Sequence, residues 1–557
     1  MGTRTRGRRF SRRSSRTKRT PYGCGSPSPN SSRTWSGKSA VIVPGSSGCF
    51  PMASGSAPAA ASSGPGSGAV SGARLPRGLM VSASTVLVVL GYLAGITAFG
   101  IWVGRRDRSV TGFFLAGRSA PFWAVAACVV ATETSVLTFT SIPGFAYEGN
   151  FGFLQLAIGF LLGRVGIALV LLPAYFRGEV VTTYELLLKR FGARVRSAAA
   201  AIFLVYRNLA DGVRLHAAAL MVAIVAGVPE WWCIVALAAA MVAFSEEGGV
   251  KATIWTDVIQ LGVYLVGAGI VVAALWQGSG AEPLDWIPAA REAGKFDVAF
   301  PAFDLTIPYT LWAGVIGGFF LTFATHGADQ YLAQRLLAAR SLRHAQAGLV
   351  LSGVGALLQF ALFLGIGAWL WHYYGGREFA RPDEVLPTFV AENLSGAAAG
   401  ITLAAVVAAA LSPSLVSLAS TTVRDFWLPW KRRRSAAGTA GDDESGQVRV
   451  GRQFVVVWGI VQTAVALVAQ RAPSALEAGL SILSYASGPT VGAFLLAVFF
   501  PRAQPTAVLI GMGGGFAAPA LIRLAGFPLA WTWDVMVGSL ATFAVGLLLS
   551  RWARPGP

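Results

Sequence analysis

Charged residues are scarce in this sequence. Asp, Glu, Lys and Arg make up 13% of its 557 residues, whereas a soluble globular domain carries about 25%. The mean hydropathy is +0.58, and apolar runs of about 20 residues, the length that spans a bilayer, recur along most of the chain. This composition excludes a soluble domain. It indicates an all-α polytopic membrane protein, because a β-barrel would show short segments of alternating polarity.

Cysteine and histidine are also rare, with four residues of each. Cys24 and Cys49 lie near the N-terminus, and Cys128 and Cys233 lie in apolar segments. This spacing indicates neither a disulfide framework nor a metal site. The sequence also lacks a catalytic dyad and a phosphate-binding loop. We therefore expect neither an enzyme nor a bound cofactor.

Acidic residues are absent from residues 1–79, which hold 13 of the 45 basic residues. The remaining chain is nearly balanced, with 32 basic and 26 acidic residues, so the net charge of +19 belongs mostly to this segment. Its Ser-, Gly- and Pro-rich composition predicts a disordered basic tail. The segment superficially resembles an organelle transit peptide; the alternative, which we favour, is a start codon assigned too early. We expect no nucleic-acid partner.

Thirteen candidate transmembrane spans follow the tail, within a predicted membrane domain at 80–552 and before a short tail at 553–557. The spans run roughly over 82–103, 121–146, 152–176, 197–227, 229–245, 252–276, 309–336, 347–373, 396–424, 452–470, 475–500, 504–526 and 530–551. Loops rich in Lys and Arg alternate with loops poor in them. The positive-inside rule then places the N-terminus outside and the C-terminus in the cytoplasm, in a multi-pass protein of the cell (inner) membrane. Residues 181–192 read as a short amphipathic helix on the cytoplasmic face.

Glu133 is the least expected residue within the spans. Ionisable groups inside a membrane are costly and tend to face the protein interior or a wet cavity. Glu133 has no basic residue within four positions, which favours a functional role. By contrast, Arg207, Asp211 and Arg214 are spaced so that they can neutralise one another along a helix, and we favour a structural role for them.

Two spans contain signals of an interrupted helix. Pro143 and Gly144 follow Glu133 in the second span, and Thr325–Asp329 (THGAD) break the apolar pattern of the seventh. The two spans are five apart, which is the spacing of inverted repeats at about 121–276 and 309–500. Paired broken helices at matching positions point to a binding site near the middle of the membrane.

Six segments together resemble the sodium:solute symporter family, in family order and over about residues 82 to 500. They are TGFFLAGRSAPFWAVA, ATETSVLTFTSIPGFAYEGN, TTYELLLKRFG, KATIWTDVIQ, GADQYLAQRLLAA and SLASTTVRDF. The resemblance implies the LeuT-type fold, a five-plus-five inverted repeat with flanking helices and about 13 transmembrane helices. It also implies alternating-access transport of a small organic solute driven by a sodium gradient.

The resemblance further implies a set of site residues. Alignment on Pro143–Gly144 and Tyr147 puts two carbonyl ligands of a sodium ion on Ala131 and Thr134, with Glu133 and Asp257 beside that ion. The family's solute site falls on Thr138 and Thr322, with Thr325 at an inner-gate position. The predicted residues of the cation site are Ala131, Glu133, Thr134, Asp257, Ala409 and Ala410.

Positions 409 and 410 depart from the family pattern. The family has hydroxyl residues there as direct sodium ligands, whereas both positions are alanine in this chain. The loss of two oxygens weakens a sodium site unless Glu133, Asp257, Ser412 or a water replaces them. Pro413 also frees the backbone carbonyl of Ala409.

Three functions therefore stay open. The first is a sodium-coupled symporter of a small organic solute. The second is a transporter of the same fold that is coupled to protons, through Glu133, or uncoupled. The third is a transporter-like sensor that acts with a separate partner protein. Thr138 and Thr322 are small neutral hydrogen-bonding residues and do not identify the solute.

Overall fold

The structure is a computed structural model that describes residues 82–104, 116–178, 180, 182–244, 250–280, 284–410, 414–434 and 444–552. The predicted tails at 1–79 and 553–557 lie outside the described residues, as do Ser412 and Pro413. The described chain is helical, apart from connecting segments and one isolated bridge between Ala120 and Ala339. The predicted all-α class is confirmed.

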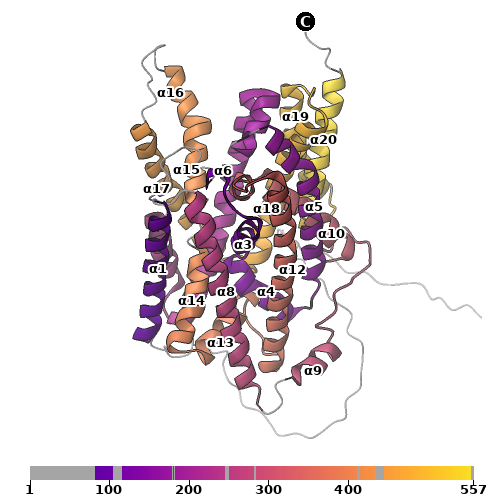
Figure 1. The fold of residues 1–557 in the computed structure, drawn as a ribbon. Coiled ribbons are helices and arrows are strands. Elements are labelled where there is room, and N and C mark those ends of the chain that lie inside the picture. Colours follow the sequence, from indigo (N-terminus) through magenta and orange to yellow (C-terminus); the bar gives the residue numbers. More distant parts are fainter. Residues whose placement is uncertain are drawn as a thin grey trace, which may run out of the picture. The chain divides into compact units, whose positions relative to one another are not determined.

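The first half of the chain forms the following elements (Figure 1). They are α1 (Ala83–Gly104), η1 (Ala116–Arg118), α3 (Phe122–Glu133), α4 (Val136–Glu148), α5 (Phe153–Arg177), α6 (Thr183–Ala226), α7 (Glu230–Phe244), α8 (Val250–Gly278) and α9 (Trp286–Glu292).

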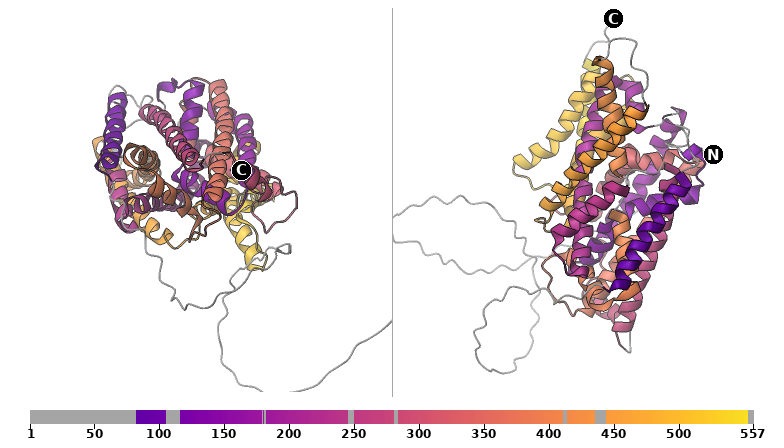
Figure 2. Two further views of the ribbon diagram at one scale, coloured as in Figure 1. Left: turned by 90° about the horizontal axis from the view of Figure 1, so that it is seen from below. Right: turned by 90° about the vertical axis from the view of Figure 1, so that its left-hand side faces the viewer.

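The second half of the chain packs its helices among those of the first (Figures 1 and 2). It consists of α10 (Leu311–Thr322), η2 (Phe323–Ala328), α11 (Gln330–Leu337), α12 (Leu342–Tyr373), η3 (Pro382–Glu384), α13 (Val385–Asn393), α14 (Gly396–Ala410), α15 (Ser414–Thr422), η4 (Val423–Trp427), α16 (Leu428–Arg434), α17 (Glu444–Ala469), α18 (Ala475–Phe499), α19 (Pro505–Leu524), η5 (Trp531–Trp533) and α20 (Asp534–Trp552).

Among the described helices, ten are long and apolar enough to cross a membrane, and the bent pair α3–α4 makes an eleventh span. α7 and α14 are apolar but shorter. With these two included, a helix or a group of consecutive helices falls on each of the thirteen predicted spans. The correspondence is close because apolar runs of this length are a local property of the sequence.

The predicted amphipathic helix at 181–192 is the first part of α6. Gly192 has φ +79° and ψ −176°, which is outside helical geometry and separates this short piece from the span that follows. Glycine adopts this conformation without a steric penalty, since it has no Cβ atom. The short piece carries the exposed ion pair between Lys189 and Glu185, 2.9 Å apart.

Small residues bring the helices around the site into close contact. α5 packs against α10, and a Cβ atom on Gly159 would lie 2.6 Å from the carbonyl oxygen of Gly314 and 2.9 Å from the Cα of Gly318. Glycine at such positions allows backbones to approach, which is how membrane helices gain packing energy. α5 is thereby held against the span that carries the second break.

The segment after α8 binds the C-terminal end of α4 through Lys295. The Lys295 ammonium donates to the carbonyl oxygens of Tyr147 (2.6 Å) and Gly149 (3.0 Å), where a cation complements the unpaired carbonyls of a helix C-terminus. Burial lowers the pKa of Lys295 below its ordinary value, and Glu148 opposes the shift. The loop at 277–308, in which the sequence shows no motif, therefore contributes to positioning a broken span.

Candidate transport site

The second predicted span is broken at Thr134–Ser135. α3 ends at Glu133, α4 begins at Val136, and the two helices meet at 62°. Thr134 has ψ +75° and Ser135 is extended. The amide N–H of Ser135, which would continue the helix ladder to Ala131, donates instead to the carbonyl oxygen of Glu133 at 2.7 Å. The break thus releases the carbonyl of Ala131 from its usual helical partner.

The position of this break corrects one sequence-based expectation. Pro143 and Gly144 lie inside α4, and the helix continues through them to Glu148. A Cβ atom on Gly367 of α12 would lie 2.8 Å from the Cα of Pro143. The Pro-Gly pair is thus a place of close packing, whereas the interruption lies about two turns earlier, at the threonine and serine.

The predicted break in the seventh span is confirmed. α10 runs into a π-helical turn, η2, which ends at Ala328. Asp329 is extended, and its Oδ1 accepts from the backbone amide of Tyr331 at 2.7 Å, which caps the new helix α11. π-Helical turns inside helices are frequent at functional sites.

Both broken spans line one cavity. Four predicted site residues meet there, namely Glu133, Thr138, Thr322 and Thr325. Thr138 and Thr322, the predicted solute residues of spans two and seven, therefore line the same cavity. Further lining residues come from α6, which contributes Arg207 and Arg214, and from α12 and α18, whose side chains there are apolar and include Phe360 and Leu480.

Glu133 is bonded to Arg164 of α5, a residue that the sequence analysis missed. Arg164 Nη2 donates to Glu133 Oε2 and lies 3.2 Å from His326 Nε2. The Arg164 side chain is fully buried, and that of Glu133 is 14% exposed. Arg164 is the one charged residue in the apolar run 153–176, and that isolation indicates that it needs a buried partner without indicating which residue supplies it.

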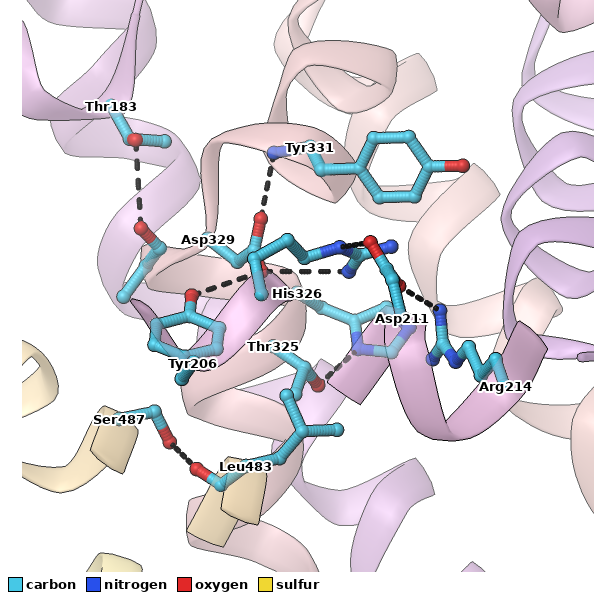
Figure 3. A network of polar contacts seen from close by, with 12 residues as sticks. Thr183, Tyr206, Asp211, Arg214, Thr325, His326, Asp329, Tyr331, Leu483 and Ser487 are labelled. Carbon is cyan, nitrogen blue, oxygen red and sulfur yellow. Dashed lines mark hydrogen bonds and ion pairs between the residues drawn. The ribbon is translucent and has the colours of Figure 1, made fainter. Parts of the chain in front are cut away.

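Ion pairs connect the break at Asp329 to the cavity (Figure 3). Asp329 Oδ2 accepts from the Tyr206 hydroxyl at 3.0 Å and lies 3.8 Å from Arg207 Nη1. Arg207 Nε donates to Asp211 Oδ2 at 2.8 Å, and Arg214 Nη1 donates to Asp211 Oδ1 at 3.3 Å. The expected mutual neutralisation along α6 is present, and it extends further, to the second broken span.

Asp257 lies beside α3, outside the set of residues that line the cavity. Its Oδ2 accepts from Arg335 Nε (3.1 Å) and Nη2 (3.0 Å). Cys128 and Thr132 of α3 donate to the same oxygen, at 3.1 and 3.3 Å. Asp257 is thus near the first broken span, as expected, but its charge is balanced by an arginine from α11.

The remaining predicted cation ligands lie on two elements. Ala131 and Thr134 are buried at the break, and Thr134 Oγ1 is 2.6 Å from Gln359 Oε1 of α12. Ala409 and Ala410 are the last two residues of α14. Residues 411–413 lie outside the described part of the chain, and α15 begins at Ser414.

Comparison with known proteins places the chain in a family. The model of the sodium:solute symporter family matches residues 113–515. The human sodium/iodide cotransporter is 28% identical over 445 residues, which cover 77% of this chain and 68% of that protein. The sodium/sialic acid symporter NanT of Aliivibrio fischeri is 26% identical over 489 residues, which cover 83% and 92%.

Solved structures show the same fold. A Na⁺-coupled sialic acid symporter in a substrate-bound outward-open state superposes with a TM-score of 0.74 at 23% identity, over 86% of this chain and 99% of that one. A nucleobase-cation-symport-1 family transporter in a closed conformation gives 0.51 at 14% identity, over 79% and 94%. These likenesses and the broken spans agree with the LeuT-type fold. The chain therefore belongs to the sodium:solute symporter family, and it is a multi-pass membrane transporter rather than an enzyme.

Proposed function

We propose that the protein is a secondary active transporter that carries a small organic solute together with Na⁺ by alternating access. The observation that carries the proposal is one cavity lined by both broken spans, through Thr138 on α4 and Thr322 on α10. Interrupted helices offer backbone groups to ions and solutes where they line a cavity. The relatives include a sodium/iodide cotransporter and a sodium/sialic acid symporter, which supports Na⁺ as the coupling ion.

The proposed cation site joins the first break to the end of α14. Ala131 and Thr134 supply carbonyl oxygens from the break. α14 packs against α4, and Phe139 and Ala405 both lie within 4 Å of the place that a Cβ on Gly267 would take. Spans two and nine cross the membrane in opposite directions. Phe139 follows the break by about one turn, and Ala405 precedes the end of α14 by about one turn. The break and the end of α14 therefore lie at about the same depth in the membrane.

Proton coupling, or no coupling, is the alternative that a specific observation favours. Ala409 and Ala410 bring no side-chain oxygen to the site, and hard cations need several oxygen ligands. Glu133 adjoins the break and is a carboxylate that could hold a proton or help to hold a cation. Either ligand would have to compete with Arg164 for that carboxylate, so we assign the main cation site to backbone carbonyls.

The internal repeats and the orientation are part of the proposal. The breaks lie in α3–α4 and in α10–α11, which are the first spans of the proposed repeats at 121–276 and 309–500. Matching breaks in the two repeats are what inverted-repeat transporters require. We also propose that the N-terminus lies outside and the C-terminus in the cytoplasm of the cell (inner) membrane.

The decisive experiment needs no known solute. The full-length protein in detergent is melted in Na⁺ and in K⁺ or choline, at equal ionic strength and pH. A ligand that binds only the folded state stabilises it, by about 2.7 kcal/mol at a concentration of 100 times Kd. We expect a saturable rise in melting temperature that is specific to Na⁺. The absence of a Na⁺ effect between pH 6 and 8 would instead support proton coupling or no coupling.

A further inference from the structure

Arg164 of α5 contacts both broken spans through a single nitrogen atom. Its Nη2 donates to Glu133 Oε2, directly before the first break, and lies 3.2 Å from His326 Nε2 in the π-helical turn of the second. Arginine has donors only, so His326 Nε2 accepts, and the imidazole is neutral with its proton on Nδ1. That Nδ1 lies 2.9 Å from Thr325 Oγ1 (Figure 3). One positive charge therefore bridges the two interruptions.

The guanidinium reaches the Glu133 carboxylate from the protein side. Glu133 lines the cavity and is 14% exposed, whereas Arg164 is fully buried and is not among the lining residues that the structure describes. Glu133 is also next to Thr134, whose carbonyl belongs to the proposed Na⁺ site. A buried carboxylate without a counter-charge is costly. The arginine thus holds a charge of +1 at a place where an exchangeable cation would otherwise be needed.

The hydrogen bonds of Arg164 are few for a buried arginine. Arg335, by comparison, donates to Asp257 through Nε (3.1 Å) and Nη2 (3.0 Å) and to the carbonyl oxygen of Tyr331 through Nη1 (2.7 Å). Arg164 uses Nη2 alone, and its Nε and Nη1 have no hydrogen-bond partner within the described residues. Each unpaired buried donor costs free energy. We therefore take the positive charge of Arg164, rather than its hydrogen bonds, to be the feature that the site uses.

The other carboxylates close to the two breaks are also paired with arginine. They are Asp211, with Arg207 and Arg214, Asp257, with Arg335, and Asp329, with Arg207. A Na⁺ ion at the breaks must therefore rely on neutral oxygens, which the carbonyls of Ala131 and Thr134 supply. A second cation close by would be repelled by the first ion and by the Arg164 guanidinium.

We propose that Arg164 is a tethered cation, whose guanidinium occupies a cation position at Glu133 that would otherwise take a second Na⁺. The protein then binds one exchangeable Na⁺, at the carbonyl site. A side chain cannot leave with the solute, so the charge at Glu133 stays in place throughout the transport cycle. This inference rests on the proposed function, because it sets the number of coupling ions at that site.

Removal of the tether gives the test. Arg164→Ala leaves Glu133 unpaired and opens space for a hydrated ion, which takes oxygen ligands from a carboxylate and from water. Binding of radioactive Na⁺, and melting in Na⁺ and in choline at equal ionic strength and pH, are measured on the full-length protein in detergent. We expect one bound Na⁺ per wild-type protein and two per Arg164→Ala protein, with a larger Na⁺-specific rise in melting temperature for the variant. An unchanged count and an unchanged rise would overturn the proposal.

Further variants separate the charge of Arg164 from a merely structural role. Arg164→Lys keeps a tethered positive charge and should bind one Na⁺, as the wild type does. The double variant Arg164→Ala/Glu133→Gln has no carboxylate at this position and should lose the second ion. Arg377→Ala is the matched control, because it leaves Glu392 unpaired at the surface, where the two side chains are 53% and 35% exposed, and should not raise the count. A second Na⁺ in any of these three variants would contradict the assignment.

The test does not depend on one variant or on the sodium coupling of the wild type. Arg164→Gln serves if the alanine variant does not fold, and two saturable Na⁺ ions in the wild type would by themselves overturn the proposal. A wild type without a Na⁺ response removes the proposed sodium coupling, whereas Na⁺ gained by Arg164→Ala still supports the tethered cation. A wild type that binds Na⁺, with a variant that gains none, keeps the coupling and removes the tether.

Discussion

The pair between Glu133 and Arg164 gives the sharpest prediction about stability. Arg164 is fully buried, and its Nε and Nη1 have no hydrogen-bond partner in the described part of the chain. Its Nη2 holds Glu133 and contacts His326. Replacing Glu133 by Gln therefore leaves a buried guanidinium without a counter-ion. The change also loosens the attachment of the first broken span to α5.

The expected loss is large for a single substitution. Removing one partner of a buried ion pair costs about 3–5 kcal/mol, because the remaining charge stays desolvated and uncompensated. Removing both charges is often nearly neutral. We therefore expect Glu133→Gln to lose about 3–5 kcal/mol of unfolding free energy. The double variant Glu133→Gln/Arg164→Met should recover most of this loss.

Denaturation of the purified variants in detergent, followed by circular dichroism, measures these free energies. The control is Glu392→Gln, since Glu392 pairs with Arg377 at the surface, where the side chains are 35% and 53% exposed and such pairs contribute about 0–1 kcal/mol. The reasoning is refuted if Glu133→Gln costs no more than this control. It is also refuted if the double variant is as unstable as the sum of the single variants, since coupled residues must be non-additive.

Three further predictions concern other parts of the molecule. Burial lowers the pKa of Lys295 in the folded protein below its ordinary value of 10.5. Between the lowered pKa and 10.5, the unfolded chain binds more protons than the folded protein does. The free energy of unfolding therefore rises with pH in this window. The melting temperature of the wild type relative to Lys295→Met should therefore increase from pH 8 to 10.5, and a decrease would contradict the sign. Gly159→Ala should lower the free energy of unfolding by about 1–3 kcal/mol, because the added methyl group overpacks α5 against α10. The control is Gly262→Ala, which has no atom within 4 Å of its Cβ position and should be neutral or slightly stabilising. Equal melting temperatures for the two variants would argue against the close packing. Ala410→Ser restores an oxygen at the proposed cation site and should lower the Na⁺ concentration that gives half-maximal thermal stabilisation. If that concentration is unchanged, α14 does not contribute to the cation site.

The interrupted spans show which features of the fold local sequence patterns can predict and which they cannot. The apolar runs, the basic loops and the motif order were enough to predict a helical membrane protein of the sodium:solute symporter family. The break near THGAD was also predictable, because Asp329 caps α11 from within the same segment. The break in the second span was misplaced, because Pro143 and Gly144 are helix-breaking residues that tertiary packing keeps inside α4.

Side-chain partners were the part that local patterns could not supply. Thr134 at the first break contacts Gln359, which is 225 positions away in the sequence, and Glu133 contacts Arg164, which is 31 positions away. No helical spacing rule connects residues so far apart. The sequence alone placed Glu133 among candidate cation ligands, whereas the structure gives it a guanidinium partner.

The sequence by itself determined the class, the spans and the family of this protein, because hydrophobic length and motif order are local properties of the chain. Tertiary structure alone decided where the second span breaks, which arginine neutralises Glu133 and which arginines line the cavity. Those outcomes depend on helices that meet only after folding, since the cost of a buried charge or a freed carbonyl is set by the groups that pack around it.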